Sequence, residues 1–367
     1  MVKARRQADR IFLVCLGILI IFGLAALMSS SSAIGFTRFN DTYFYIKRQI
    51  LFGVLPGLIL FIIFSKIDYH LWQKVALFFY GITLILLGLV FIDGIGLVIN
   101  GSKSWVSFGN YSLQPAEIAK LSVIIMLALL LSKKEYVWND WKSSLLPIVG
   151  LIIPALILIA LQPDVGTLSI VAMVMFAMMM VGKVPARYLV IISLIGVLGF
   201  VGLIFAAPYR AQRLTTFLHP ELDPKGVGYQ VNQAFLAVGS GGFWGLGFGH
   251  SRQKFQYLPE VNADSIFAVI AEENGFLVST GFVLLIVTLA LRGLKIARGA
   301  PDDFGGLLVT GIVVWFSWQS FLNIGAMVGA LPLTGVPLPF VSHGGSAMMM
   351  ALAGAGLITN ISTFSKI

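Results

Sequence analysis

Charged side chains are scarce in this chain. Only 11% of its 367 residues are Asp, Glu, Lys or Arg, whereas 58% are hydrophobic. Because a soluble domain carries charge at about 25% of its positions, this composition excludes a soluble protein. The sequence therefore predicts an integral membrane protein.

Cysteine and the common nucleotide-binding motifs are rare or missing as well. Cys15 is the single cysteine of the sequence, which excludes an internal disulfide. No GxxxxGKS/T loop and no dinucleotide fingerprint occur, so a nucleotide site is not expected. The formal net charge of +9 is spread along the chain, and nucleic-acid binding, which needs a clustered basic face, is not expected either.

Apolar runs that can cross a hydrocarbon core of about 30 Å recur from one end of the sequence to the other. They predict an all-α polytopic membrane protein with a single domain, 1–367, and a long polar loop at about 208–264 between the seventh and eighth spans. The predicted spans are 11–28, 50–65, 74–93, 117–132, 145–161, 167–182, 187–207, 265–291, 305–329 and 345–361.

Lys and Arg residues accumulate before the first span and in alternate connections after it. Connections rich in basic residues face the cytoplasm in membrane proteins. The pattern predicts a multi-pass protein of the cytoplasmic membrane with both termini in the cytoplasm and the 208–264 loop outside. The first run lacks a small-residue cleavage pattern, so we interpret it as a retained helix.

Asp264 stands where the long loop meets the next apolar run, with Glu260 just before it. A carboxylate placed at the membrane boundary is a candidate general base. From the sequence alone, N-capping of the following helix explains Asp264 equally well. Glu272 lies further inside the apolar run, where an ionisable side chain is expected to face the bundle interior or a wet cavity.

Glu117 and Lys120 are one turn apart near the start of a predicted span, which Pro115 introduces. At this spacing the two side chains can pair. An ionisable pair within the membrane is costly and therefore a functional candidate, and a purely structural ion pair is an even competitor. Trp105 in the preceding outer segment fits a substrate contact or a membrane-interface anchor.

The segment 239–250 is rich in glycine. Such loops can bind phosphate through their backbone N–H groups, but this spacing fits neither known phosphate loop. Glycine also permits tight bends and close packing of backbones, and we favour this structural interpretation.

Five segments of the sequence resemble the signature segments of the SEDS family, the FtsW and RodA glycosyltransferases. They are QPAEIAK at 114–120, QPDVGT at 162–167, GYQVNQAFLAVGSGG at 228–242, LPEVNADSIFAVIAEENGF at 258–276 and PLTGVPLPFVSHGGSA at 332–347. The glycine-rich loop and the GVPLPF motif are more similar to FtsW than to RodA. The resemblance implies a GT-C-like SEDS fold with ten spans and both ends inside.

The same resemblance implies a peptidoglycan glycosyltransferase. Such an enzyme polymerises lipid II into glycan strands on the outer face of the membrane and releases undecaprenyl diphosphate. Asp264 matches the family's catalytic aspartate and is assigned the role of general base in an inverting transfer. Lys120 matches a functionally important lysine and is expected to offset the charge of the diphosphate, with Glu117 orienting it.

The other predicted site residues are expected to bind substrate. They are Trp105, Lys103, Arg210, Arg213 and Glu272. The two arginines are assigned to the diphosphate because a guanidinium can hold phosphate with two donors, although ordinary solvation of a loop explains them as well. The family also implies a divalent cation, Mg or Mn, whose ligands the sequence does not reveal.

The chain departs from the family pattern at three places. Asn262, Ala263 and Ser265 surround Asp264 where the family has His-Thr-Asp-Phe, and His343 replaces a tyrosine. Ser104 stands where an arginine commonly precedes the tryptophan, although the neighbouring Lys103 can supply that charge.

Two other functions suit a ten-helix bundle with buried charges. One is a lipid II flippase, which needs a path open to both sides of the membrane. The other is a non-catalytic division scaffold, in which Asp264 would be dispensable. The expected partners are lipid II, a class B penicillin-binding protein that supplies transpeptidation, and other divisome or elongasome membrane proteins.

Overall fold

The computed structural model describes residues 7–99, 102–109, 111–133, 141–205, 208–219, 226–255 and 257–365. Each predicted span corresponds to an apolar helical segment, so the predicted fold class is confirmed. These segments are α1 (Arg10–Phe39), α2 (Phe44–Gln49) continued by the π-helical turn η1 (Ile50–Val54) and α3 (Leu55–Lys66), α4 (His70–Leu89), α5 (Pro115–Leu131), α6 (Trp141–Leu161), α7 (Val165–Val181), α8 (Ala186–Phe205), α11 (Ile266–Arg298), α12 (Asp303–Met327) and α13 (Gly345–Ser362).

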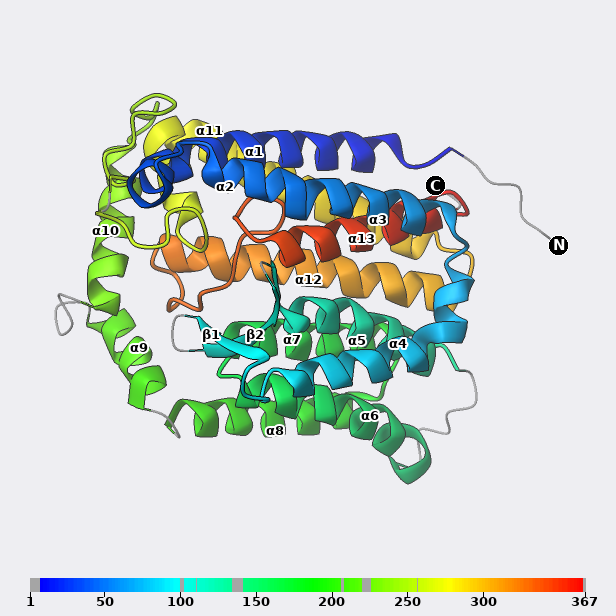
Figure 1. The fold of residues 1–367 in the computed structure, drawn as a ribbon. Coiled ribbons are helices and arrows are strands. Elements are labelled where there is room, and N and C mark those ends of the chain that lie inside the picture. The colour runs from blue at the N-terminus through cyan, green and yellow to red at the C-terminus, as the bar shows by residue number, and fades with distance from the viewer. Residues whose placement is uncertain are drawn as a thin grey trace.

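Eight helices in the described part of the chain are long and apolar enough to cross a membrane. The helices α5 and α7 are shorter, with 17 residues each. In Figure 1, α12 and α13 run through the middle of the bundle. Their apolar stretches are 72% and 83% buried, whereas the apolar stretch of α8 is only 6% buried. The apolar surface of α8 is therefore left to the lipid or to a partner.

The start of α1 and the end of α13 lie at one end of the bundle (Figure 1). There Asp9 caps α1 through a 2.9 Å hydrogen bond from the backbone N of Phe12. Arg292, near the end of α11, pairs with Asp9 at 2.6 Å, and the backbone N of Asp9 donates to Ser362 Oγ at the end of α13. The start of α11 therefore lies at the opposite end of the bundle.

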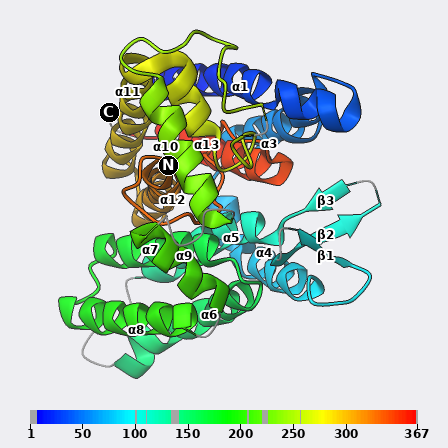
Figure 2. The ribbon, with the colours of Figure 1, turned by 90° about the vertical axis from the view of Figure 1, so that its left-hand side faces the viewer.

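That opposite end carries structure that the sequence analysis did not predict. The connection between spans seven and eight contains two helices, α9 (Pro208–Leu218) and α10 (Val227–Ser240), and α10 crosses the end of the bundle (Figure 2). A small antiparallel sheet before α5 has the order β1-β2-β3, with β1 at Gly96–Ile99, β2 at Ser102–Phe108 and β3 at Tyr111–Leu113.

The helix α11 is broken at Gly275, whose φ of 72° is outside the helical range. The break releases backbone groups, and the glycine-rich segment satisfies them. The backbone N–H groups of Leu246 and Gly247 donate to the carbonyls of Glu272 and Glu273, at 3.0 and 2.9 Å. In return, Phe276 N donates to the carbonyl of Gly242 at 2.9 Å. Backbone polar groups at membrane depth must be satisfied within the protein, which this pairing achieves.

The structural interpretation of the glycine-rich segment is therefore confirmed. A Cβ on Gly241 would lie 2.1 Å from the carbonyl oxygen of Ala271, and one on Gly245 would lie 2.3 Å from that of Glu273. Only glycine allows the two backbones to approach so closely.

We expect Gly275→Ala to destabilise the protein by more than about 1 kcal/mol, because alanine is strained at positive φ. Its Cβ would also lie 2.2 Å from the backbone N of Gly245. The measurement is the thermal unfolding midpoint of the purified variant. Gly281→Ala on the same helix is the control, since its Cβ meets no atom within 4 Å. Equal unfolding midpoints for the two variants would contradict the proposed close approach.

Candidate functional site

Asp264 lies directly before α11, at the end of the bundle opposite the termini. The N-cap of α11 is Ser265, and it makes no side-chain capping hydrogen bond. The alternative role of Asp264 as an N-cap is therefore wrong. Its side-chain Oδ1 is buried and has no hydrogen-bond partner in the described part of the chain. An unpartnered buried carboxylate oxygen is costly and is available to a substrate.

The surroundings of Asp264 favour its neutral form. Burial, and then the nearby charge of Glu260, raise the pKa of the Asp264 carboxyl to about 7. The positive charge of Arg213 acts in the opposite direction. A carboxylate whose pKa lies near neutral pH can accept a proton from a hydroxyl group and release it again.

The Asp264 loop is fixed by hydrogen bonds from α12 and α10. Asn323 Nδ2 on α12 donates to the backbone carbonyl of Asp264 at 2.7 Å and to that of Val336 at 2.8 Å. Gln230 Nε2 on α10 donates to Ser265 Oγ at 3.0 Å. These contacts bring the long loop against the segment 331–344 between α12 and α13.

The segment 331–344 also binds the residues just before Asp264. Ser342 Oγ donates to the carbonyl of Ala263 at 2.5 Å, and His343 N donates to that of Asn262 at 2.8 Å. Burial, and then the charge of Arg48, lower the pKa of the His343 ring to about 4, so the ring is neutral at neutral pH. The ring stands nearly perpendicular to that of Tyr45, with ring centres 5.2 Å apart.

Glu117 and Lys120 form the predicted ion pair inside the bundle. The ammonium of Lys120 lies 2.8 Å from Glu117 Oε2, and the two side chains are 1% and 2% exposed. Lys120 Nζ also donates to Gln319 Oε1 at 2.8 Å and lies 4.9 Å from the ring centre of Trp315. A buried charge of this kind is tolerated only because its partners satisfy it.

The ion pair and Asp264 are connected through α12. Gln319 Nε2 donates to the carbonyl of Pro337 at 2.7 Å. Asn323, one turn further along α12, donates to the carbonyls of Val336 and Asp264. A small cavity between the pair and the segment 331–344 is lined by Glu117, Gln319 and Ser342, among others. Gln319 and Asn323 were not predicted, because an amide within an apolar span carries no motif of its own.

The remaining predicted site residues are found in different places. Lys103 lies on β2, where its ammonium pairs with Asp93 at 2.6 Å, and Trp105 follows on the same strand. Arg213 on α9 is close enough to Asp264 for its positive charge to lower the pKa of the Asp264 carboxyl. Arg210 belongs to the same helix, and its side chain lies outside the described part of the structure.

Glu272 is hydrogen-bonded to the loop that precedes Asp264. Its carboxylate accepts hydrogen bonds from Ser251 Oγ and from the backbone N–H groups of Arg252 and Gln253, the latter two at 3.0 and 3.4 Å. These bonds hold the loop that precedes Asp264.

The predicted divalent cation would need a cluster of ligand side chains. Within the described ranges, no group of three or more His, Cys, Asp or Glu side chains could hold a metal ion. The divalent cation stays a prediction, and no chemical step below depends on one.

Comparison with known proteins places this geometry in a family. The FtsW, RodA and SpoVE family, described as cell cycle proteins, matches residues 9–367. The chain belongs to this family. It is 38% identical over 366 residues to stage V sporulation protein E of Bacillus subtilis, covering 100% of both chains. It is also 33% identical over 364 residues to the probable peptidoglycan glycosyltransferase FtsW of Geobacter metallireducens, covering 99% of this chain and 97% of that one.

Two solved structures share the family fold. One is a chain of a peptidoglycan synthase complex that coordinates polymerization and crosslinking, with a TM-score of 0.80, 27% identity and 97% of each chain covered. The other is the rod shape determining protein RodA of Thermus thermophilus, with a TM-score of 0.71, 26% identity and 98% of each chain covered. The family and fold predicted from the five sequence segments are confirmed.

Proposed function

We propose that this protein is a peptidoglycan glycosyltransferase that polymerises lipid II into glycan strands. The observation that carries the proposal is Asp264, whose carboxyl has a pKa of about 7 and whose Oδ1 is buried without a partner among the described residues, in a chain of the FtsW, RodA and SpoVE family. Relatives of this chain are named peptidoglycan glycosyltransferases.

Asp264 is the general base of the proposed reaction. The acceptor sugar hydroxyl is a poor nucleophile, and Asp264 removes its proton as the oxygen attacks the anomeric carbon of the donor. The bond from that carbon to the diphosphate oxygen breaks, and undecaprenyl diphosphate leaves with the bonding electrons. Attack from the face opposite the diphosphate inverts the anomeric centre, so an α-linked donor becomes a β-linked polymer.

Cationic side chains near Asp264 stabilise the departing diphosphate. Arg213 is the first candidate, since its charge already acts on Asp264. Lys120 is engaged by Glu117 and Gln319, so it must exchange one of these partners to reach a phosphate oxygen. A cation aimed at developing negative charge in a poorly solvated site contributes strongly to catalysis.

The reaction takes place on the outer side of the cytoplasmic membrane in this proposal. Both termini and the basic residues Arg292, Lys295 and Arg298 belong to one end of the bundle, and Asp264 belongs to the other. The positive-inside rule assigns the basic end to the cytoplasm. Asp264 then faces the compartment in which glycan strands are assembled.

A class B penicillin-binding protein is the proposed partner. A chain of similar fold belongs to a peptidoglycan synthase complex in which polymerization and crosslinking are coordinated. Transpeptidation by such a partner would crosslink the strands that this protein makes. Other divisome or elongasome membrane proteins complete the proposed assembly.

The test is polymerisation of labelled lipid II by the purified protein, with and without its cognate penicillin-binding protein. Formation of long glycan by the wild-type protein supports the proposal. Lipid II scrambling between leaflets without polymer would identify a flippase. If neither activity is seen with the partner present, the protein is a scaffold.

The polymerisation rate is expected to depend on pH through Asp264. The base must be deprotonated, so kcat/KM should be low below pH 7 and rise to a plateau above the pKa of about 7. Initial rates between about pH 5 and pH 9 measure this profile. Glu260→Gln removes the like charge that raises this pKa, so it should shift the rise to lower pH. A wild-type profile that is already flat at pH 5 would refute the assignment.

A further inference from the structure

Asp264 lies in a loop that contains little regular structure. Between the end of α10 at Ser240 and the start of α11 at Ile266, the chain has no helix or strand in its described residues. A general base must nevertheless be held within a fraction of an ångström of its reacting geometry. Hydrogen bonds from Asn323, Gln230, Ser342 and His343 hold the residues next to Asp264. The earlier part of the loop, before Leu258, needs an attachment of its own.

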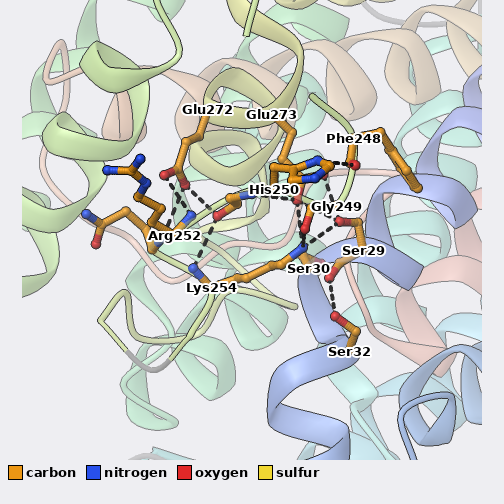
Figure 3. A network of polar contacts seen from close by, with 12 residues as sticks. Ser29, Ser30, Ser32, Phe248, Gly249, His250, Arg252, Lys254, Glu272 and Glu273 are labelled. Carbon is orange, nitrogen blue, oxygen red and sulfur yellow. Dashed lines mark hydrogen bonds and ion pairs between the residues drawn. The ribbon is translucent and has the colours of Figure 1, made fainter. Parts of the chain in front are cut away.

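Lys254 connects this loop to two helices. Its ammonium lies 2.9 Å from Glu273 Oε1 on α11 and 3.1 Å from Ser29 Oγ on α1. It also donates to the carbonyl of Gly249 in its own loop at 2.7 Å. The side chains of Lys254 and Glu273 are 3% and 2% exposed. Figure 3 shows these residues converging on the Lys254 ammonium.

Neighbouring contacts also join α1 and the loop to Glu273 on α11. Ser29 Oγ donates to the Glu273 carboxylate at 2.7 Å, and the backbone N of Ser251 donates to Glu273 Oε1 at 3.3 Å. The adjacent Glu272 accepts hydrogen bonds from the backbone N–H groups of Arg252 and Gln253. Glu272 and Arg252 lie beside each other in Figure 3. We call the contact among Lys254, Glu273 and Ser29 the Lys254 clamp.

The clamp encloses Asp264 between two fixed points. Lys254 precedes Asp264 by ten residues and Glu273 follows it by nine. On the C-terminal side of Asp264, α11 is helical from Ile266 to its break at Gly275 and therefore rigid. On the N-terminal side of Asp264, Leu258 N donates to the carbonyl of Gln253 at 2.9 Å.

The last turn before Asp264 is also held by hydrogen bonds. The backbone N–H groups of Ala263 and Ser265 both donate to the carbonyl of Glu260, at 3.0 and 3.1 Å. Hydrogen-bonded turns thus lie on both sides of the short stretch between the clamp and Asp264. We therefore expect a displacement of Lys254 to shift Asp264.

A buried ion pair contributes little net stability, because desolvating the two charges offsets their attraction. Packing alone could join α1 to α11 with apolar side chains. We propose that Lys254 is a positioning residue of the transferase, which holds the Asp264 loop against α1 and α11 in the reactive geometry. This inference rests on the proposed function and adds a residue to its machinery.

The main test is the Lys254→Met variant of the full-length protein in its complex with the penicillin-binding protein. We expect kcat for lipid II polymerisation to fall by about 10- to 100-fold, because a small misplacement of a catalytic group has effects of this size. KM should change by less than about three-fold, since the clamp does not touch the substrate site. The rise of the pH profile should move below pH 7, because a loosened loop admits water to Asp264.

A second variant separates positioning from folding. Lys254→Met leaves Glu273 buried without its cation, which can impair folding. Lys254→Met/Glu273→Gln removes both charges, so its unfolding midpoint should return toward that of the wild type while kcat stays low. Ser29→Ala retains both charges and should show a smaller loss, about three-fold, in kcat.

The matched control is Lys47→Met. Like Lys254, Lys47 pairs with a carboxylate, that of Asp41 at 2.8 Å, but the Lys47 side chain is 65% exposed. This variant should keep the wild-type kcat and pH profile. If the double variant is folded and retains the wild-type kcat and pH profile, Lys254 is structural and the proposal is wrong.

Hydrogen exchange tests the clamp independently of activity. The amides of Ala263 and Ser265 should exchange faster in Lys254→Met than in the wild type, because their turn is no longer anchored. Unchanged protection would overturn the clamp whether or not the protein polymerises lipid II. A wild-type protein without polymerase activity would instead overturn the proposed function.

Discussion

Asp264→Asn is expected to reduce lipid II polymerisation by about 10²- to 10⁴-fold, the usual contribution of a general base. The amide has nearly the same size as the carboxylate but cannot accept the proton of the acceptor hydroxyl. Initial rates with labelled lipid II, measured at pH 8 where the wild-type base is deprotonated given its pKa of about 7, provide the comparison.

The same substitution should leave the fold intact. Asp264 Oδ1 is buried and has no partner among the described residues, so a neutral amide costs no more to place there than the carboxylate. Asp303→Asn is the matched control, because Asp303 is an exposed carboxylate in the first turn of α12 at the opposite end of the bundle. Full polymerase activity in Asp264→Asn would remove the basis of the proposed mechanism.

Lys120→Met is expected to have the second largest effect. It leaves Glu117 buried and without its cation, and breaking a buried pair in this way costs about 3–5 kcal/mol. It also removes one of the two cations that we propose for the diphosphate, the other being Arg213. We therefore expect a lower unfolding midpoint, measured on the purified protein, together with loss of polymerisation.

The double variant Lys120→Met/Glu117→Gln distinguishes the two consequences. With both charges removed, no unpaired ion remains, and the unfolding midpoint should recover most of the loss. Polymerisation should remain impaired if Lys120 acts on the substrate. Recovery of the full rate in the double variant would show that the ion pair serves the fold alone.

The spans could be predicted because the membrane imposes a length and a composition on each of them. The run beginning at Ile266 reads as apolar in sequence and forms α11 in the structure. The sequence did not reveal the break at Gly275, since a single glycine within an apolar run is compatible with a continuous helix. The break depends on a second backbone, the segment 241–247, lying close enough to bind the released groups.

The polar connections were predicted less completely. The helices α9 and α10 and the three-stranded sheet were missed, because these short elements lack a long periodic pattern and pack against the end of the bundle. Lys254 was also missed. In sequence it is one lysine in a polar loop, and its significance depends on two helices, α1 and α11, that are distant along the chain.

The sequence by itself determined the membrane class, the spans, the pairing of Glu117 with Lys120 and the family resemblance that singled out Asp264. Each of these follows from composition or from residues that are close along the chain. Only the tertiary structure decided that Asp264 is not an N-cap, that burial and Glu260 raise its pKa to about 7, and that Glu272 binds the loop backbone. The reason is that burial, hydrogen bonding and electrostatic fields arise between segments that meet only after the chain has folded.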